Sequence, residues 1–184
     1  GLVMTWYHPL GDEPKWEMPE IAEFNGDPDM APMTTRDYTV KAHWQEMAEN
    51  GPDFIHLKTV HGAATVPEME EIAYEGWTGR IRAKVDFATP RGPQPGRIDT
   101  DSWGPGVGLA RFTGIIDTVF FAGTTPIDWE WTLSVKAYKV RKLGADAEAL
   151  AKTQRVGDAL IADLSDTEQR QIYRDTAKAF YRLP

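Results

Sequence analysis

The alternation of apolar and polar residues along the second half of the chain predicts β-strands. Residues 77–87, 108–123 and 128–140 carry a period of two, in which successive side chains point to opposite faces of a sheet. The last segment separates an apolar set from a polar set: Trp129, Trp131, Leu133, Val135 and Ala137 against Glu130, Thr132, Ser134 and Lys136. We therefore expect one face of that strand to be buried, and a hairpin connection at residues 124–126.

The first half of the chain has a mixed pattern. Alternation at residues 1–14 predicts an entry strand, whereas residues 19–32 and 90–105 are rich in proline, glycine and polar residues, which favours loops. Residues 38–61 have a helical pattern that is interrupted at Gly51-Pro52, because proline cannot donate a hydrogen bond inside a helix. The region is thus expected to be irregular chain around two short helices.

The end of the chain is expected to be helical. The pattern changes at about residue 146, and Ser165 followed by Glu168 is a capping-box signature that starts a final helix. Strands followed by a C-terminal helix predict an α+β fold, in which a curved antiparallel sheet wraps a long helix. The 184 residues fit a single domain.

Composition excludes several classes of protein. The formal charge of −8 argues against a nucleic-acid partner, which demands a basic face. The sequence contains no cysteine, so it offers no disulfide, no thiolate nucleophile and no cysteine ligand for an iron–sulfur cluster. No apolar stretch is long enough to span a bilayer. We expect a cytoplasmic protein.

Two of the four histidines, His56 and His61, lie close together, with Asp53 three residues before the first. Two imidazoles and one carboxylate on one face of an octahedral ion form the site of non-haem iron(II) oxygenases. Five steps along a regular α-helix rotate the second side chain by about 140°, so chelation requires a wide turn, a bend or a helix end between Leu57 and Val60. The alternative is that one histidine faces solvent and the other packs in the core.

Other residues have alternative interpretations. Asp53 can approach the ring of His56 or act as a first-turn acid after Pro52, and the two roles are compatible. Asn50 is typical of a helix end, and the glycines of residues 103–112 of a turn, since no helix follows them. Trp129 and Trp131, if they face inward, would suit an apolar substrate cavity. His8 and His43 have no matching partner and are expected to be surface or structural residues.

The segment ENGPDFIHLKTVHG at residues 49–62 resembles the Rieske non-haem iron oxygenases, and within them the branch of 3-ketosteroid 9α-hydroxylase and the cholesterol 7-desaturases. Further matches are WYHP at residues 6–9, the P-x-W-E-x-P segment at 14–19, SWGPG at 102–106 and TPID at 125–128. The resemblance spans nearly the whole chain. It implies a helix-grip, START-like catalytic domain.

The resemblance also implies roles for individual residues. His56 and His61 would bind iron(II), Asp53 would link His56 to a Rieske cluster on a neighbouring subunit, and Asn50 would lie near the metal. The third ligand would be a carboxylate on the C-terminal helix, for which Asp175 matches best. Lys178 and Ala179 stand where the branch usually has an Ile-Trp pair, so Asp163 and Asp166 remain alternatives.

A [2Fe–2S] Rieske cluster needs two cysteines, which this chain lacks, so we expect the Rieske domain to lie outside it, N-terminal or on a partner chain. The resemblance then implies a terminal oxygenase that hydroxylates or desaturates a steroid-like ring with O2, a ferredoxin or flavin reductase as electron source, and a homotrimer. The alternative is a non-catalytic module that binds an apolar ligand such as a sterol.

Overall fold

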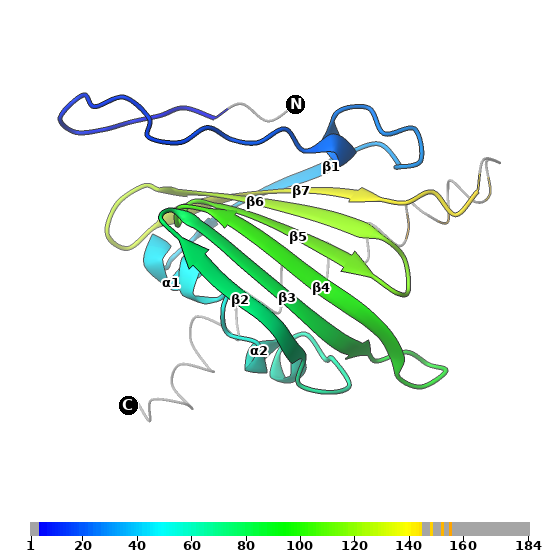
Figure 1. Ribbon diagram of the computed structural model, residues 1–184. Helices are drawn as coiled ribbons and strands as arrows, with labels where there is room; N and C mark the ends of the chain where they lie inside the picture. The colour runs from blue at the N-terminus through cyan, green and yellow to red at the C-terminus, as the bar shows by residue number, and fades with distance from the viewer. Residues whose placement is uncertain (1–3, 145–147, 149–151, 153–154, 156–184) are drawn as a thin grey trace.

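One antiparallel sheet of seven strands dominates the computed structural model, which describes residues 4–144, 148, 152 and 155 (Figure 1). Its spatial order is β1-β7-β6-β5-β4-β3-β2. The strands are β1 (Thr34–Val40), β2 (Glu68–Glu75), β3 (Thr78–Phe87), β4 (Gln94–Trp103), β5 (Val107–Thr113), β6 (Thr118–Pro126) and β7 (Thr132–Val140). Strands β2 to β7 form a meander, and β1 adds to the far side of β7.

Three short helices precede the meander: the 3₁₀ helix η1 (Ala22–Phe24), α1 (Trp44–Glu49) and α2 (Ile55–Thr59). The side chain of His43 caps α1 by accepting a hydrogen bond from the backbone N–H of Gln45 at 3.3 Å. The chain leaves α1 at Asn50, and Gly51-Pro52 separates the two helices. No helix in the described residues is long and apolar enough to cross a membrane.

The outer face of the sheet is covered by the N-terminal segment, drawn in blue in Figure 1. Leu109, Phe121 and Ala137 are buried on this face, and Trp16 and Phe24 pack against them. An ion pair fastens the same segment, since Arg111 Nε lies 2.6 Å from Glu23 Oε1. This hydrogen bond from Arg111 lowers the pKa of Glu23 below its ordinary value of 4.5.

The inner face of the sheet faces α1 and α2, which Figure 1 shows on the side away from the N-terminal segment. Phe54, just before α2, is buried against Ile81 and Ala83 of β3, and Leu57 packs on the same cluster. Helix α1 lies against β6. The inner face therefore carries helices on both of its halves, with room between them.

The structure confirms the antiparallel sheet, the strands near residues 77–87 and 128–140, and the break at Gly51-Pro52. The segment 108–123 is extended as expected but forms two strands, β5 and β6, because residues 114–117 make a turn between them. The hairpin connection lies slightly later than expected, because residues 124–126 still pair with β7 and the turn is made by residues 127–131. Asp128 holds this turn, since Oδ1 accepts the backbone N–H groups of Glu130 and Trp131 at 2.8 Å each. The expected C-terminal helix and its capping box lie outside the described residues.

Three predictions about the strands are wrong. Residues 4–14 form no strand, because the N-terminal segment has no partner strand and His8 Nδ1 accepts backbone N–H groups in a turn. Residues 38–40 belong to β1 rather than to a helix, because β1 pairs with β7 along its length. The expected loop at residues 90–105 contains β4, which pairs with strands on both sides.

The prediction of a single buried face on β7 is also wrong. Thr132 and Ser134 of the expected solvent-facing set are buried, as is Ala137 of the apolar set. The reason is that both faces of the sheet are covered, one by the N-terminal segment and the other by the helices. A polar side chain on β7 therefore has to be satisfied within the protein, as Thr132 is through its hydrogen bond to Ala42 O at 2.7 Å.

Candidate functional site

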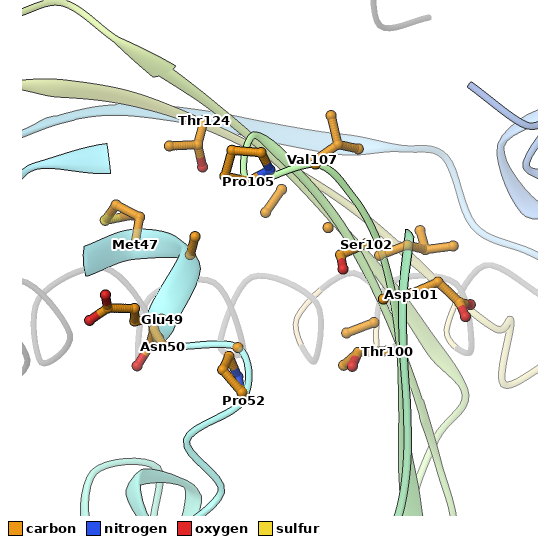
Figure 2. Close-up of a pocket in the computed structure, with 18 of the residues that line it drawn as sticks. Met47, Glu49, Asn50, Pro52, Thr100, Asp101, Ser102, Pro105, Val107 and Thr124 are labelled. Carbon is orange, nitrogen blue, oxygen red and sulfur yellow. The ribbon is translucent and has the colours of Figure 1, made fainter. Parts of the chain in front are cut away.

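A cavity of about 710 Å³ lies between α1 and the inner face of the sheet. Figure 2 shows Met47, Asn50 and Pro52 on one side of it and Thr100, Ser102 and Thr124 on the other. Much of its lining is apolar: Val40, Trp44, Met47, Ile81, Ala110, Phe120 and Ala122. The volume falls in the range of roughly 300–1,000 Å³ that is usual for small-molecule sites.

Asn50 and the Gly51-Pro52 break join this cavity to the histidine segment. Asn50 is the C-terminal cap of α1, as its helix-ending character predicts, and it also lines the cavity. His56 and His61 follow in α2 and its C-terminal turn and are not themselves among the lining residues. The link to the cavity is Phe54, two residues before His56, which packs on the cavity-lining Ile81.

The turn after α2 has the non-ideal geometry that chelation requires. Helix α2 ends at Thr59, and the backbone N–H groups of Val60 and His61 both donate to His56 O, at 2.7 and 3.3 Å. The bond from His61 closes a five-residue, π-type step. Gly62 has a φ of 69°, which lets the chain fold back so that Ala63 N–H donates to Leu57 O at 2.9 Å.

This turn brings the two imidazoles together. The ring centroids of His56 and His61 are 5.0 Å apart, and the ring planes meet at 70°. His56 is half-buried and His61 is exposed. Nδ1 of His56 is hydrogen-bonded to the backbone carbonyl of Asp53. A carbonyl only accepts, so Nδ1 carries the proton and Nε2 keeps the lone pair that binds a metal.

Asp53 contacts His56 through its backbone carbonyl, whereas its carboxylate contacts the start of α2. Its backbone carbonyl orients His56, and its carboxylate Oδ1 accepts the N–H of Ile55, the first residue of α2, at 3.0 Å. The side chain is exposed. A hydrogen-bond acceptor on the second ring nitrogen is the usual support for a metal-binding histidine.

The third ligand falls outside this geometry. Within the described ranges, no three His, Asp or Glu side chains are grouped closely enough to hold a metal ion. Asp163, Asp166 and Asp175 all lie outside the described residues. The imidazole pair, with its fixed tautomer on His56, is a donor set that suits iron(II), and a carboxylate has to complete it.

The two tryptophans proposed for the cavity are placed elsewhere. Trp129 and Trp131 belong to the turn between β6 and β7 rather than to the strand, and neither is among the cavity-lining residues. Trp129 is 84% exposed and stacks on the ring of His43, with centroids 5.6 Å apart. The alternation that grouped them with Leu133 continues into the turn by coincidence.

Sequence reasoning missed the polar wall of the cavity. Tyr38, Thr124, Ser134 and Lys136 line it from β1, β6 and β7. Ser134 and Lys136 of β7 were expected to face solvent, because polar residues usually face water. A signal was available in the polar set of this strand, Glu130, Thr132, Ser134 and Lys136. It contains a threonine and a serine, which can be buried when they form hydrogen bonds, and only a single lysine.

The fold defines the class of the protein. Similar solved structures include a START superfamily protein from Mycobacterium smegmatis, with a TM-score of 0.59 and 12% identity over 76% of this chain and 96% of that one. Dicamba monooxygenase has a TM-score of 0.64 and 14% identity, over 84% of this chain and 52% of that one. At these identities the likeness shows the fold alone, an open antiparallel sheet like that of the START superfamily protein.

The sequence defines the family. Residues 5–176 match the family described as 3-ketosteroid 9alpha-hydroxylase C-terminal domain, and the chain belongs to this family of oxygenase catalytic domains. Cholesterol 7-desaturases are relatives: the protein from Caenorhabditis elegans is 41% identical over 63 residues, and that from Hemicentrotus pulcherrimus 43% over 63 residues. Each match spans 34% of this chain but only 14% and 13% of those proteins.

Proposed function

We propose that this chain is the mononuclear iron domain of a Rieske-type oxygenase that hydroxylates or desaturates a steroid-like substrate. The observation that carries the proposal is the His56–His61 pair, held 5.0 Å apart by a π-type turn beside an apolar cavity. The names of the family and of its relatives point to 3-ketosteroids and cholesterol as the class of substrate.

His56 and His61 would hold the iron together with a carboxylate from the C-terminal region. Asp175 is our first choice for that carboxylate, with Asp163 and Asp166 as alternatives. When bound, iron(II) supplies the redox chemistry by which such sites activate O2.

The chain itself would orient and enclose the substrate. The hydrogen bond from His56 Nδ1 to Asp53 O fixes the ring that faces the metal. The apolar lining from α1, β3 and β6 excludes water and favours a hydrocarbon skeleton. Asn50 lines the cavity on the side nearest to the histidines and would contact the substrate or the metal's surroundings there.

The electrons would come from outside this chain. With no cysteine, it cannot bind a [2Fe–2S] Rieske cluster, so a Rieske domain on the same protein or on a partner would supply them, fed by a ferredoxin or flavin reductase. The exposed carboxylate of Asp53 is suitable for contact with a Rieske domain of a neighbouring subunit. A homotrimer and a cytoplasmic location would follow from the same family assignment.

A second candidate is a module that binds an apolar ligand without chemistry. The START-type fold and the cavity favour it, since both are equally compatible with storage or transport of a sterol. The two candidate functions differ in whether they require bound iron. A binding module would take up its ligand without metal and without dependence on His61.

The test is turnover with isotopic oxygen. The iron(II)-loaded chain is mixed with a Rieske-domain protein, reductase, ¹⁸O2 and either a 3-ketosteroid or cholesterol. A product that is hydroxylated with ¹⁸O or has lost two hydrogens, and that is absent with His56→Ala, supports the proposal. Product formation by this chain without any Rieske protein, or equal product with His56→Ala, contradicts it.

A further inference from the structure

Three hydroxyl side chains form a row across one half of the cavity wall. Ser134 of β7 is the direct cross-strand partner of Tyr38 on β1 and of Thr124 on β6. Directly paired residues of neighbouring strands share a face of the sheet, and all three line the cavity. Figure 2 shows Thr124 at this side of the cavity, across from Met47 of α1.

Ser134 is the central member of this row, and its hydroxyl is buried without a hydrogen bond. The residue is 1% exposed, and within the part of the chain that the structure describes Oγ has no partner. Burying a hydroxyl without a partner is costly, and such groups are uncommon in folded proteins. A hydroxyl in the wall of a cavity is therefore positioned for a partner that the described residues do not supply.

The surroundings of Ser134 favour a neutral oxygen as this partner. Lys136, two residues along the same face, lies over the rings of Tyr38 and Phe120, with Nζ 5.6 and 5.8 Å from their centroids. These contacts direct the ammonium toward aromatic faces. Glu49 is also among the lining residues and offsets the charge of Lys136, so the cavity has no excess of positive charge that would select an anion.

The row lies on the opposite half of the sheet from the histidines. Phe54, which precedes α2, packs on β3, and four strand spacings separate β3 from β7. At about 4.8 Å per spacing this is a distance of roughly 19 Å along the sheet. A molecule that reaches from one side to the other has to be elongated.

We propose that Ser134, flanked by Tyr38 and Thr124, hydrogen-bonds a neutral hydroxyl or ketone oxygen at one end of an elongated apolar ligand. That this ligand is the substrate of an oxygenase rests on the proposed function. Ser134 Oγ is covered in this structure, so a neighbouring side chain has to move for the ligand to make this contact.

Ligand binding to the iron-free chain tests the oxygen contact alone. The probes are cholesterol, cholestane, which lacks the oxygen, and cholesterol sulfate, which carries a charge. Trp44 lines the cavity, so its fluorescence reports binding. The variants are Ser134→Ala and Thr124→Val, and Thr125→Val is the matched control, because Thr125 is the neighbour of Thr124 on the opposite face of β6.

Wild type is expected to bind cholesterol more tightly than cholestane. Ser134→Ala is expected to weaken cholesterol binding by about three- to tenfold, the range for one hydrogen bond, and to leave cholestane unchanged. Thr124→Val is expected to have a smaller effect in the same direction, and Thr125→Val none. Because Ser134 Oγ has no partner to lose in the described chain, the Tm of Ser134→Ala should equal or exceed that of wild type.

Several results would overturn this proposal. They are equal affinity of wild type for cholesterol and cholestane, no measurable binding of either, equal weakening of both by Ser134→Ala, and preferential binding of the sulfate. A fall in the Tm of Ser134→Ala would show a structural role for the hydroxyl. The assay contains no iron, so its result does not depend on whether the proposed iron site exists. If Ser134→Ala weakens cholesterol binding but the chain binds no iron, the oxygen contact is supported and the proposed oxygenase is contradicted.

Discussion

The imidazole rings of His56 and His61 lie 5.0 Å apart although a regular helix would point them to opposite sides. The cause is local. His56 O accepts the N–H groups of both Val60 and His61, so the last turn of α2 widens by one residue. A sequence spacing that is unfavourable for chelation on an ideal helix therefore becomes suitable for it at a helix end.

Gly62 is expected to be necessary for this geometry. Its φ of 69° is strained for any residue with a Cβ, while a Cβ there would meet nothing within 4 Å, so Gly62→Ala tests backbone conformation alone. The expected cost is about 1–2 kcal/mol, which would weaken iron(II) binding by about tenfold where it distorts the turn. Anaerobic iron(II) titration measures this.

The matched control is Gly76→Ala, at φ 58° in the β2–β3 turn and equally free of contacts. It should lower the free energy of unfolding by a similar amount and leave iron affinity unchanged. Gly62→Asn should retain affinity, because asparagine tolerates a left-handed backbone. Equal iron affinity in wild type and Gly62→Ala would show that the conformation of Gly62 is not needed for metal binding.

Asp175 is expected to be the carboxylate that completes the metal site. Loss of one ligand should weaken iron(II) binding by at least about tenfold. Loss of a residue that only hydrogen-bonds to a metal ligand already weakens metal binding by about that factor or more. Iron content after anaerobic reconstitution and gel filtration should fall in Asp175→Ala and stay at the wild-type level in Asp163→Ala and Asp166→Ala. If iron content falls only in Asp163→Ala or only in Asp166→Ala, that aspartate is the third ligand instead of Asp175.

The Glu23–Arg111 pair should make stability depend on pH. The pKa of Glu23 is lowered in the folded state by the hydrogen bond from Arg111, so its contribution is present above the ordinary value of 4.5 and is lost as pH falls through the lower folded pKa. Glu23→Gln should therefore cost about 1 kcal/mol at pH 7 and less at pH 3.

Urea unfolding of wild type and Glu23→Gln at both pH values measures this difference. Glu20→Gln is a control, because that carboxylate contacts Asn25 rather than a cation. A difference between wild type and Glu23→Gln that is the same at pH 7 and pH 3 would show that the charge of Glu23 does not stabilise the N-terminal segment on the sheet.

Much of the sheet could be predicted from the sequence, because alternation marks β3, β5, β6 and β7 directly. Strand β4 could not, since Pro95 and Gly96 resemble loop residues. Gly96 is required there by packing: a Cβ would come within 2.2 Å of Thr113 O and 2.5 Å of the Phe87 ring. Pairing with both neighbours overrides a composition that favours a loop.

The candidate site was predictable to a different extent in each half. The histidine pair could be proposed because the segment at residues 49–62 resembles a family motif, whereas the spacing of the two histidines alone did not predict that their rings meet. The hydroxyl row of Tyr38, Thr124 and Ser134 could not, because three strands assemble it and each residue alone is unremarkable. Alternation identifies two faces of a strand, but it does not reveal that both are covered.

The iron content of the chain tests the account most directly. After anaerobic reconstitution with iron(II) and removal of free metal, wild type and His8→Ala, whose histidine lies in the N-terminal turn, should retain a single iron per chain. His56→Ala and His61→Ala should each lose most of it. Equal iron content in wild type, His56→Ala and His61→Ala would contradict the metal site and the oxygenase built on it.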